Sequence, residues 1–164
     1  MVADDWQLVR SLILGLGNAI LGDDAVGLRV ARAVAERWSD AEGVTIAEEE
    51  RGGLALLEQL TGFDRALLID AIQTGAPVGT LHHLGVDSVP TQRTATAHGI
   101  NLRMALEMGR RSGLSLPANK AIAILGIEAG DVLTFAETLS TELELAIPPA
   151  LEAVREWLRH EEDA

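Results

Sequence analysis

The chain has 164 residues, no cysteine and a formal net charge of −12, from 13 Lys and Arg against 25 Asp and Glu. This length fits a single domain over residues 1–164, which can bury roughly 68–70% of its unfolded surface without extra cross-links. The lack of Cys excludes disulfides, thiolate zinc sites, iron–sulfur ligation and a Cys nucleophile. Because so acidic a surface repels phosphate backbones, we expect no nucleic-acid partner.

We expect neither a targeting signal nor a membrane span in this sequence. Residues 1–6 (MVADDW) are acidic where a signal peptide is basic, and no run of ~18 apolar residues occurs. A reducing cytoplasm is the simplest compartment for a chain without Cys, and we expect a monomer. The acidic runs at 48–50 and 161–163 are typical of solvated faces or tails, so the acidic termini are candidates for disorder.

The first half of the chain predicts strands and helices in alternation. Residues 11–15 (SLILG) form an apolar run ended by glycine, typical of a strand buried on both faces. A helix is predicted after the acidic pair Asp23-Asp24, because apolar residues then recur at helical spacing. The apolar face of this helix carries Val26, Val30, Ala33, Val34 and Trp38.

A second strand is predicted at 44–47, and the glycine pair at 52–53 turns the chain into a short helix. We expect Leu54, Leu57 and Leu60 to point inward from this helix. Residues 64–70 (DRALLID) predict a third strand, which ends at Asp70.

The second half predicts two further strands and two helices. Residues 79–84 alternate in polarity, which favours a strand at the edge of the sheet. A helix is expected from His98 to Arg111, with cations in its last turn and Gly113 as its stop. Residues 121–126 predict the fifth strand. The segment 139–158 has a helical pattern, which the proline pair at 148–149 is expected to kink or to restart.

Strands alternating with helices predict an α/β fold with three layers: a mostly parallel, twisted five-stranded sheet with helices on both faces. In such folds ligands bind beyond the carboxyl ends of the strands. That rule brings Asp24, Asp70 and His98 together, because two follow strands and the third begins a helix on the return path. Two carboxylates and an imidazole suit a borderline divalent ion such as nickel or zinc, with positions left for an outside ligand.

Each of these residues also has a structural interpretation. One acid of the pair Asp23-Asp24 is expected to cap the following helix. The Asp70 carboxylate, after four apolar residues, needs a charge or several donors nearby, and the backbone of the 71–75 turn is an alternative to a metal. His98 alone is weak evidence for a site, and it becomes a candidate ligand only because Asp24 and Asp70 are expected at the same edge. His82 and His83 point to opposite faces of a strand, and we interpret both as surface or packing residues.

The glycine turn at 14–18 (LGLGN) has the beginning of a dinucleotide-binding fingerprint, but Ile20 stands at its third glycine position. No Gly-Lys-Ser/Thr follows, so the turn is not a phosphate-binding P-loop. We therefore interpret it as a tight turn from strand to loop. A nucleotide-binding module is the alternative.

From about Leu12 to Leu158, the chain resembles the hydrogenase maturation endopeptidases, which process the large subunit of nickel–iron hydrogenases. The resemblance rests on the order of several short motifs. These are LGLGN at 14–18, GDD at 22–24, LIDAI at 68–72, AHGI at 97–100, LGIE at 125–128 and IPPAL at 147–151.

The resemblance implies a metal-dependent, aspartyl-type endopeptidase that removes a C-terminal extension from the precursor large subunit after nickel insertion. It assigns the nickel-contacting and catalytic positions to Asp24, Asp70 and His98. The nickel would belong to the substrate, so the site checks that insertion is complete. The metal could polarise the carbonyl or activate a water, or it could only position the chain while a carboxylate acts as general base. We favour metal-assisted positioning with water as nucleophile.

Two departures from the family pattern stand in this sequence. Ala25 follows the acidic pair where the family usually has Gly, and residues 52–56 (GGLAL) replace the family's Gly-Thr-x-Gly. The second change concerns how the substrate is held. The rival from another class is a receiver-like phosphoacceptor domain that would use the acidic pair and Asp70. However, the pair lies several residues beyond Gly17, and Lys120 precedes the fifth strand rather than following it.

Overall fold

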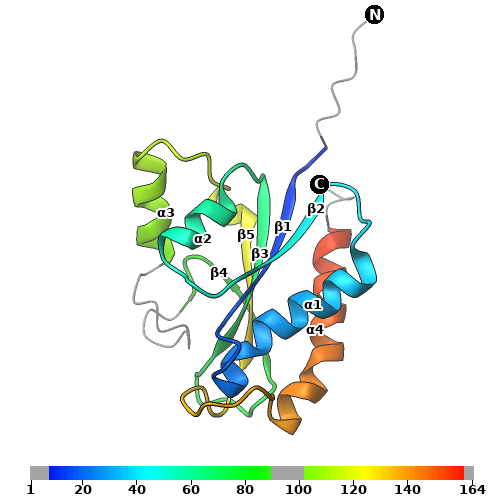
Figure 1. The fold of residues 1–164 in the computed structure, drawn as a ribbon. Helices are drawn as coiled ribbons and strands as arrows, with labels where there is room; N and C mark the ends of the chain where they lie inside the picture. The colour runs from blue at the N-terminus through cyan, green and yellow to red at the C-terminus, as the bar shows by residue number, and fades with distance from the viewer. Residues whose placement is uncertain (1–7, 90–101, 161–164) are drawn as a thin grey trace, which may run out of the picture.

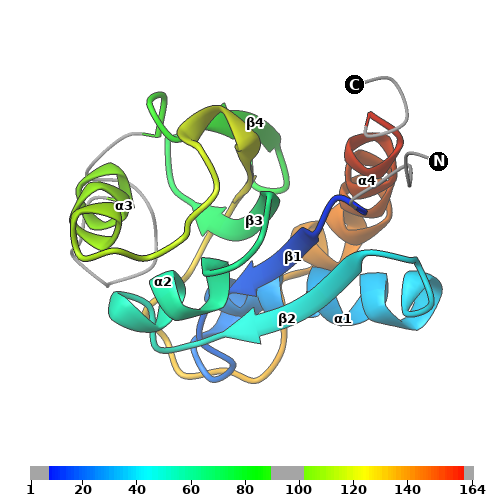
Figure 2. The ribbon, with the colours of Figure 1, turned by 90° about the horizontal axis from the view of Figure 1, so that it is seen from above.

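A computed structural model describes residues 8–89 and 102–160 of the chain. Its five-stranded sheet, in the order β2-β1-β3-β5-β4, lies between two layers of helices (Figures 1 and 2). The strands are β1 (Ser11–Leu16), β2 (Val44–Glu49), β3 (Arg65–Ile72), β4 (Leu81–Gly85) and β5 (Ile122–Glu128). The α-helices are α1 (Val26–Trp38), α2 (Leu54–Leu60), α3 (Leu102–Arg111) and α4 (Thr141–Arg159); η1 (Gly22–Ala25) and η2 (Asn119–Ala121) are short 3-10 helices.

The predicted α/β fold is confirmed. Four strands are parallel, and β4 pairs antiparallel with β5 at the edge, where the sequence placed it. Among the described residues no helix has the length and apolar character to cross a membrane. The acidic segments predicted as disordered termini, 1–6 and 161–163, lie outside the described ranges.

Two hydrophobic clusters attach the helical layers to opposite faces of the sheet. Along β3, Leu67 and Ile69 pack toward α1 and α4, whereas Ala66 and Leu68 pack toward α2 and α3. This alternation follows from the two-residue period of a strand. Figure 2, seen from above, shows α1 and α4 on one side of the sheet and α2 and α3 on the other.

Three details differ from the sequence-based expectations. Leu54 is 75% exposed rather than inward, because it stands at the first position of α2, before the buried stripe that begins at Leu57. The third strand does not end at Asp70. It continues to Ile72, since the apolar residues Ala71 and Ile72 keep their pairing with β5.

The third difference concerns α4: of the two predicted outcomes, a restart at the prolines is wrong, because the helix runs from Thr141 to Arg159 with Pro148 and Pro149 inside it. Each proline removes one helical hydrogen bond, to the carbonyl four residues earlier. Those carbonyls belong to Glu144 and Leu145, which are exposed, so water can satisfy them. The buried stripe continues on both sides of the prolines and attaches both halves to the core; it comprises Leu143, Ala146, Ala150, Leu151 and Val154.

The closest approach between layers is that of α1 to the β1–β3 junction. A Cβ atom built on Gly27 would lie 2.2 Å from the Ile69 carbonyl oxygen and 2.3 Å from that of Leu16. One built on Gly15 would lie 2.3 Å from the Gly27 carbonyl oxygen and 2.6 Å from the Ala31 Cβ. Only glycine therefore fits on either side of this contact, which sets how closely the start of α1 meets the sheet.

We expect Gly27→Ala to lower the free energy of unfolding by at least about 2 kcal/mol, although Ala is the better helix former by about 1 kcal/mol. The added methyl group has no room without moving α1 off the sheet. Urea unfolding followed by circular dichroism measures this. Gly85→Ala is the control, because the nearest atom to its new Cβ is 3.9 Å away. A Gly27→Ala protein as stable as the wild type would show that the contact can relax freely.

Candidate active site

Every buried acidic side chain in the described part of the chain lies at one edge of the sheet, where the parallel strands end. These residues are Asp23, Asp24, Glu49, Asp70 and Glu128, each with an exposed fraction of 5% or less. Glu49 ends β2, the acidic pair follows β1, Asp70 lies on β3 and Glu128 ends β5. At the bottom of Figure 1 this edge is bordered by the loops that follow β1, β3 and β5.

Between β1 and β3 the strand order reverses, because β2 lies on one side of β1 and β3 on the other. In open α/β sheets ligands bind in the crevice at such a switch point, beyond the carboxyl ends of the strands. Asp24 follows one of these two strands and Asp70 lies on the other. The fold thus places two of the three predicted site residues at the switch point.

Asp24 lies in η1 and is buried, with 4% of its surface exposed. A tight turn positions it: a Cβ on Gly17 would lie 2.1 Å from the Asp24 carbonyl oxygen. The φ of Gly17 is +152°, within the range that favours glycine. The interpretation of LGLGN as a strand-to-loop turn is therefore confirmed. Ile20, which stands at the third glycine position of the fingerprint, is 47% exposed.

Asp70 is 5% exposed and points to the face of the sheet covered by α2 and α3, since it alternates with Ile69 and Ala71. The start of α1 lies directly against Ile69, the neighbour of Asp70, through the contact at Gly27. The Asp70 side chain is thus buried on the α2/α3 face, while α1 packs against the backbone of β3 from the opposite face.

His98, the third predicted site residue, lies outside the described residues. Within residues 8–89 and 102–160, no group of three His, Asp or Glu side chains is arranged to hold a metal ion. That Asp24, Asp70 and His98 bind a metal together therefore stays a prediction from the sequence.

Asp23 does not cap the helix that follows it, contrary to expectation, and neither does Asp24: η1 and α1 have no side-chain cap. Asp23 instead holds the loop between β5 and α4 at both of its ends. Its carboxylate accepts hydrogen bonds from the Gly130 amide (3.0 Å), the Ser140 amide (2.8 Å) and the Ser140 hydroxyl (3.0 Å). This residue serves the scaffold of the site.

The prediction that the acidic run at 48–50 is a solvated face is wrong for Glu49. Its carboxylate is buried and accepts hydrogen bonds from the Arg51 backbone (2.7 Å), the Arg51 guanidinium (3.1 Å) and Gln59 of α2 (3.2 Å). Burial raises the pKa of Glu49, but the hydrogen bonds from Arg51 and Gln59 outweigh it and leave the pKa below its ordinary value. Glu49 thereby fixes the glycine turn before α2.

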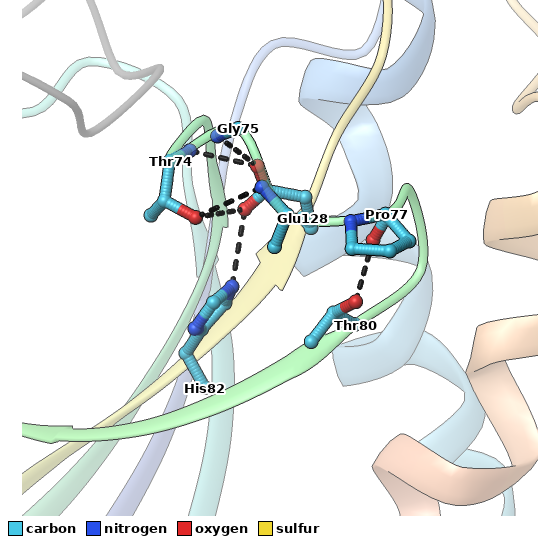
Figure 3. A network of polar contacts seen from close by, with 7 residues as sticks. Thr74, Gly75, Pro77, Thr80, His82 and Glu128 are labelled. Atoms are coloured by element: carbon cyan, nitrogen blue, oxygen red, sulfur yellow. Dashed lines mark hydrogen bonds and ion pairs between the residues drawn. The ribbon is translucent and has the colours of Figure 1, made fainter.

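Glu128, at the end of β5, holds the turn that follows β3 by hydrogen bonds (Figure 3). One carboxylate oxygen of Glu128 accepts hydrogen bonds from the backbone amides of Thr74 (2.7 Å) and Gly75 (2.9 Å). The other oxygen lies 3.1 Å from the Thr74 hydroxyl and 3.1 Å from His82 Nε2. His82, expected to be a surface or packing residue, therefore has a specific partner. Burial raises the pKa of Glu128, but the hydrogen bonds from Thr74, His82 and Gly75 outweigh it, so the pKa is lowered.

Sequence reasoning missed Glu49 and Glu128 as buried members of this edge. The available signal was their position, since each is an acid that ends its strand shortly after a run of mostly apolar residues. A carboxylate there faces the amides of the next turn, which lack partners within the sheet.

We expect Glu128→Gln to lower the free energy of unfolding by about 1–3 kcal/mol at neutral pH, because the amide cannot accept all of these hydrogen bonds. Since the folded pKa of Glu128 lies below its ordinary value, the carboxylate stabilises the fold above that ordinary value. Its contribution is lost as the pH falls through the folded pKa. The difference between the two proteins should thus shrink on acidification, as measured by urea unfolding from pH 7 to pH 3.

The matched control is Glu107→Gln, which removes an exposed carboxylate 3.3 Å from Arg111 on α3. That change should alter stability by no more than about 0.5 kcal/mol. A stability difference between wild type and Glu128→Gln that is the same at pH 3 and pH 7 would contradict the assignment.

Comparisons with known proteins agree with this geometry. The model of the hydrogenase maturation protease family matches residues 28–157. Hydrogenase 2 maturation protease of Escherichia coli (strain K12) is 32% identical over 155 residues, covering 92% of each chain. The hydrogenase expression/formation protein HupD of Thiocapsa roseopersicina is 25% identical over 150 residues; the match covers 90% of this chain and spans 66% of that relative's length.

Among solved structures, the hydrogenase maturating endopeptidase HybD from E. coli superposes with a TM-score of 0.80 at 29% identity, covering 93% of this chain and 94% of that one. HycI from Thermococcus kodakarensis KOD1, at 23% identity and a TM-score of 0.70, shares the fold. A family model that matches most of the chain, together with a full-length relative and a full-length structural match, establishes the assignment: the chain belongs to the hydrogenase maturation protease family.

Proposed function

We propose that this chain is the endopeptidase that removes the C-terminal extension from the nickel-loaded precursor of a nickel–iron hydrogenase large subunit. One observation carries the proposal: in a member of the maturation protease family, two buried carboxylates, Asp24 and Asp70, lie at the switch point of the sheet. Buried carboxylates at such a place are suited to a cation. The absence of Cys supports a cytoplasmic site of action, and we take the enzyme to be a monomer.

The metal in this proposal is part of the substrate. Nickel held by the precursor would dock on Asp24, Asp70 and His98, two oxygen donors and one nitrogen donor that suit a borderline divalent ion. Three protein ligands leave coordination positions for groups of the precursor. A precursor without nickel lacks this anchoring contact, so the site distinguishes finished from unfinished large subunits.

Cleavage then needs a water molecule next to the scissile peptide. Water attacks the carbonyl carbon, the C–N bond breaks, and the proton that water releases reaches the departing amine through a carboxylate of the site. The protein contributes chiefly by holding the peptide in position, since the loops after β2, β3 and β5 are each held by hydrogen bonds to a buried carboxylate. This route accommodates a chain without Cys and without an evident Ser–His–Asp arrangement.

The receiver-like alternative is not favoured by these observations. The acidic pair lies beyond a loop after β1, and Asp23 is engaged with the β5–α4 loop rather than with Asp70. The similar proteins are maturation proteases.

We expect Asp24→Asn, Asp70→Asn and His98→Ala each to lower kcat/KM for nickel-loaded precursor by at least about 100-fold, equivalent to about 3 kcal/mol of transition-state stabilisation. Asp40→Asn, an exposed carboxylate at the far end of α1, is the matched control and should retain full activity. Processing is followed by the mass of the large subunit, and thermal melts check that each variant folds.

A second readout separates metal recognition from chemistry. Wild-type protein should bind nickel-loaded precursor more tightly than nickel-free precursor, whereas each of the three site variants should bind the two forms equally weakly. Cleavage of nickel-free precursor at the wild-type rate would contradict recognition of nickel. Unchanged processing by His98→Ala and Asp70→Asn would contradict the site.

A further inference from the structure

The loop between β5 and α4, residues 129–140, exposes two large apolar side chains. Leu133 is 84% exposed and Phe135 is 79% exposed, whereas Val132 and Leu139 of the same loop are buried in the core. Full burial of a side chain such as Leu or Phe is worth roughly 1.5–3 kcal/mol. In the isolated chain these two side chains therefore contribute little to folding, which leaves their surface available for a partner.

Hydrogen bonds hold this loop in one shape. Asp23 binds the amides of Gly130 and Ser140 at its two ends. In its middle, Ala136 pairs with the turn after β1: its amide donates to the Ile20 carbonyl (3.0 Å), and its carbonyl accepts from the Gly22 amide (2.9 Å). The exposure of Leu133 and Phe135 is thus fixed by the scaffold, and presenting them to a partner has a small entropic cost.

The loop borders the candidate active site. Ile20, itself 47% exposed, accepts a hydrogen bond from the Ala136 amide and lies shortly before Asp24 in the chain. Beside the loop lies a cavity of about 430 Å³, lined by Asp23, Val78, Asp131, Leu139 and Glu142 among others. Asp23, the neighbour of Asp24 in the chain, lines this cavity, so the loop and the cavity adjoin the segment that carries Asp24.

The two chain segments that carry the exposed apolar residues are acidic. Residues 17–28 and 130–142 contain no Lys or Arg. Asp131, Glu137 and Glu142 are all exposed in the second of these segments. Hydrogen bonds from Thr134 and Leu133 lower the pKa of Asp131, which keeps this carboxylate charged. A partner that carries Lys or Arg beside apolar side chains complements this surface.

We propose that Leu133, Phe135 and Ile20, with the acidic residues Asp131, Glu137 and Glu142 around them, form a docking surface. It binds a segment of the precursor large subunit that carries apolar side chains next to Lys or Arg. This inference rests on the proposed function and adds a contact with the precursor outside the nickel site proposed at Asp24, Asp70 and His98. A second copy of this chain is a poor occupant, because it would bring two acidic surfaces together.

The double variant Leu133→Ser/Phe135→Ser tests the apolar part. With nickel-loaded precursor as the probe, we expect KM to rise at least about tenfold and kcat to stay within about twofold, because the surface binds without touching the reacting atoms. The thermal midpoint should stay near the wild-type value, since both side chains are exposed. Leu145→Ser, 71% exposed on α4, is the matched control and should leave KM unchanged.

The acidic residues of the docking surface are tested by Glu137→Lys in the β5–α4 loop. The matched control is Glu156→Lys, the same charge change at an exposed position near the C-terminal end of α4. Only the first should raise KM, and the increase should be smaller at 500 mM than at 50 mM NaCl, because salt screens exposed charges.

The outcomes separate the two proposals. If the wild-type protein cleaves the precursor and the double variant keeps its KM, the docking inference is wrong and the proposed function stands. A rise in KM for Leu54→Ser alone would place docking at the β2–α2 turn and also overturn the inference. If the wild-type protein does not cleave nickel-loaded precursor, both fail.

Discussion

The structure depends on the contact between α1 and the junction of β1 with β3. Gly15 and Gly27 lack side chains at a contact where a Cβ on either residue would collide with backbone carbonyl oxygens. Because α1 sits so close, the chain before it must turn sharply after β1, and that turn buries Asp24 beside the strand that carries Asp70. A packing constraint between glycines and backbone thus determines where the candidate site can form.

The remaining buried carboxylates extend this edge into a rigid frame. Glu49, Asp23 and Glu128 each accept hydrogen bonds from backbone amides of a neighbouring loop, and each loop follows a different strand. Such charge-assisted hydrogen bonds are stronger than neutral ones, and they give the buried charges the partners that burial demands. The loops that would meet a protein substrate are therefore fixed before the substrate arrives, which limits the entropy lost on binding.

How far sequence reasoning reached can be judged from particular residues. The strand pattern placed β4 at the edge and located the turn at Gly17, because alternation and glycine act locally. It misjudged Glu49 as solvated and expected one acid of the pair Asp23-Asp24 to cap the following helix. Partners that decide these roles come from other elements: Gln59 of α2 binds Glu49, and Ser140, which precedes α4, binds Asp23. The prolines of α4 misled for a related reason: a buried stripe held by tertiary contacts carries the helix across them.

The sequence by itself determined the fold class and the order of the strands along the chain, since periodicity is a local property. The choice of Asp24 and Asp70 as site residues came from acids beside apolar runs and from the family resemblance, and it stays a prediction. The tertiary structure alone decided which acids serve the scaffold and which stand at the switch point. It also brought the β5–α4 loop, more than a hundred residues away in the chain, against the turn that precedes Asp24. Burial and hydrogen bonding across such separations depend on the packed sheet, which no local pattern encodes.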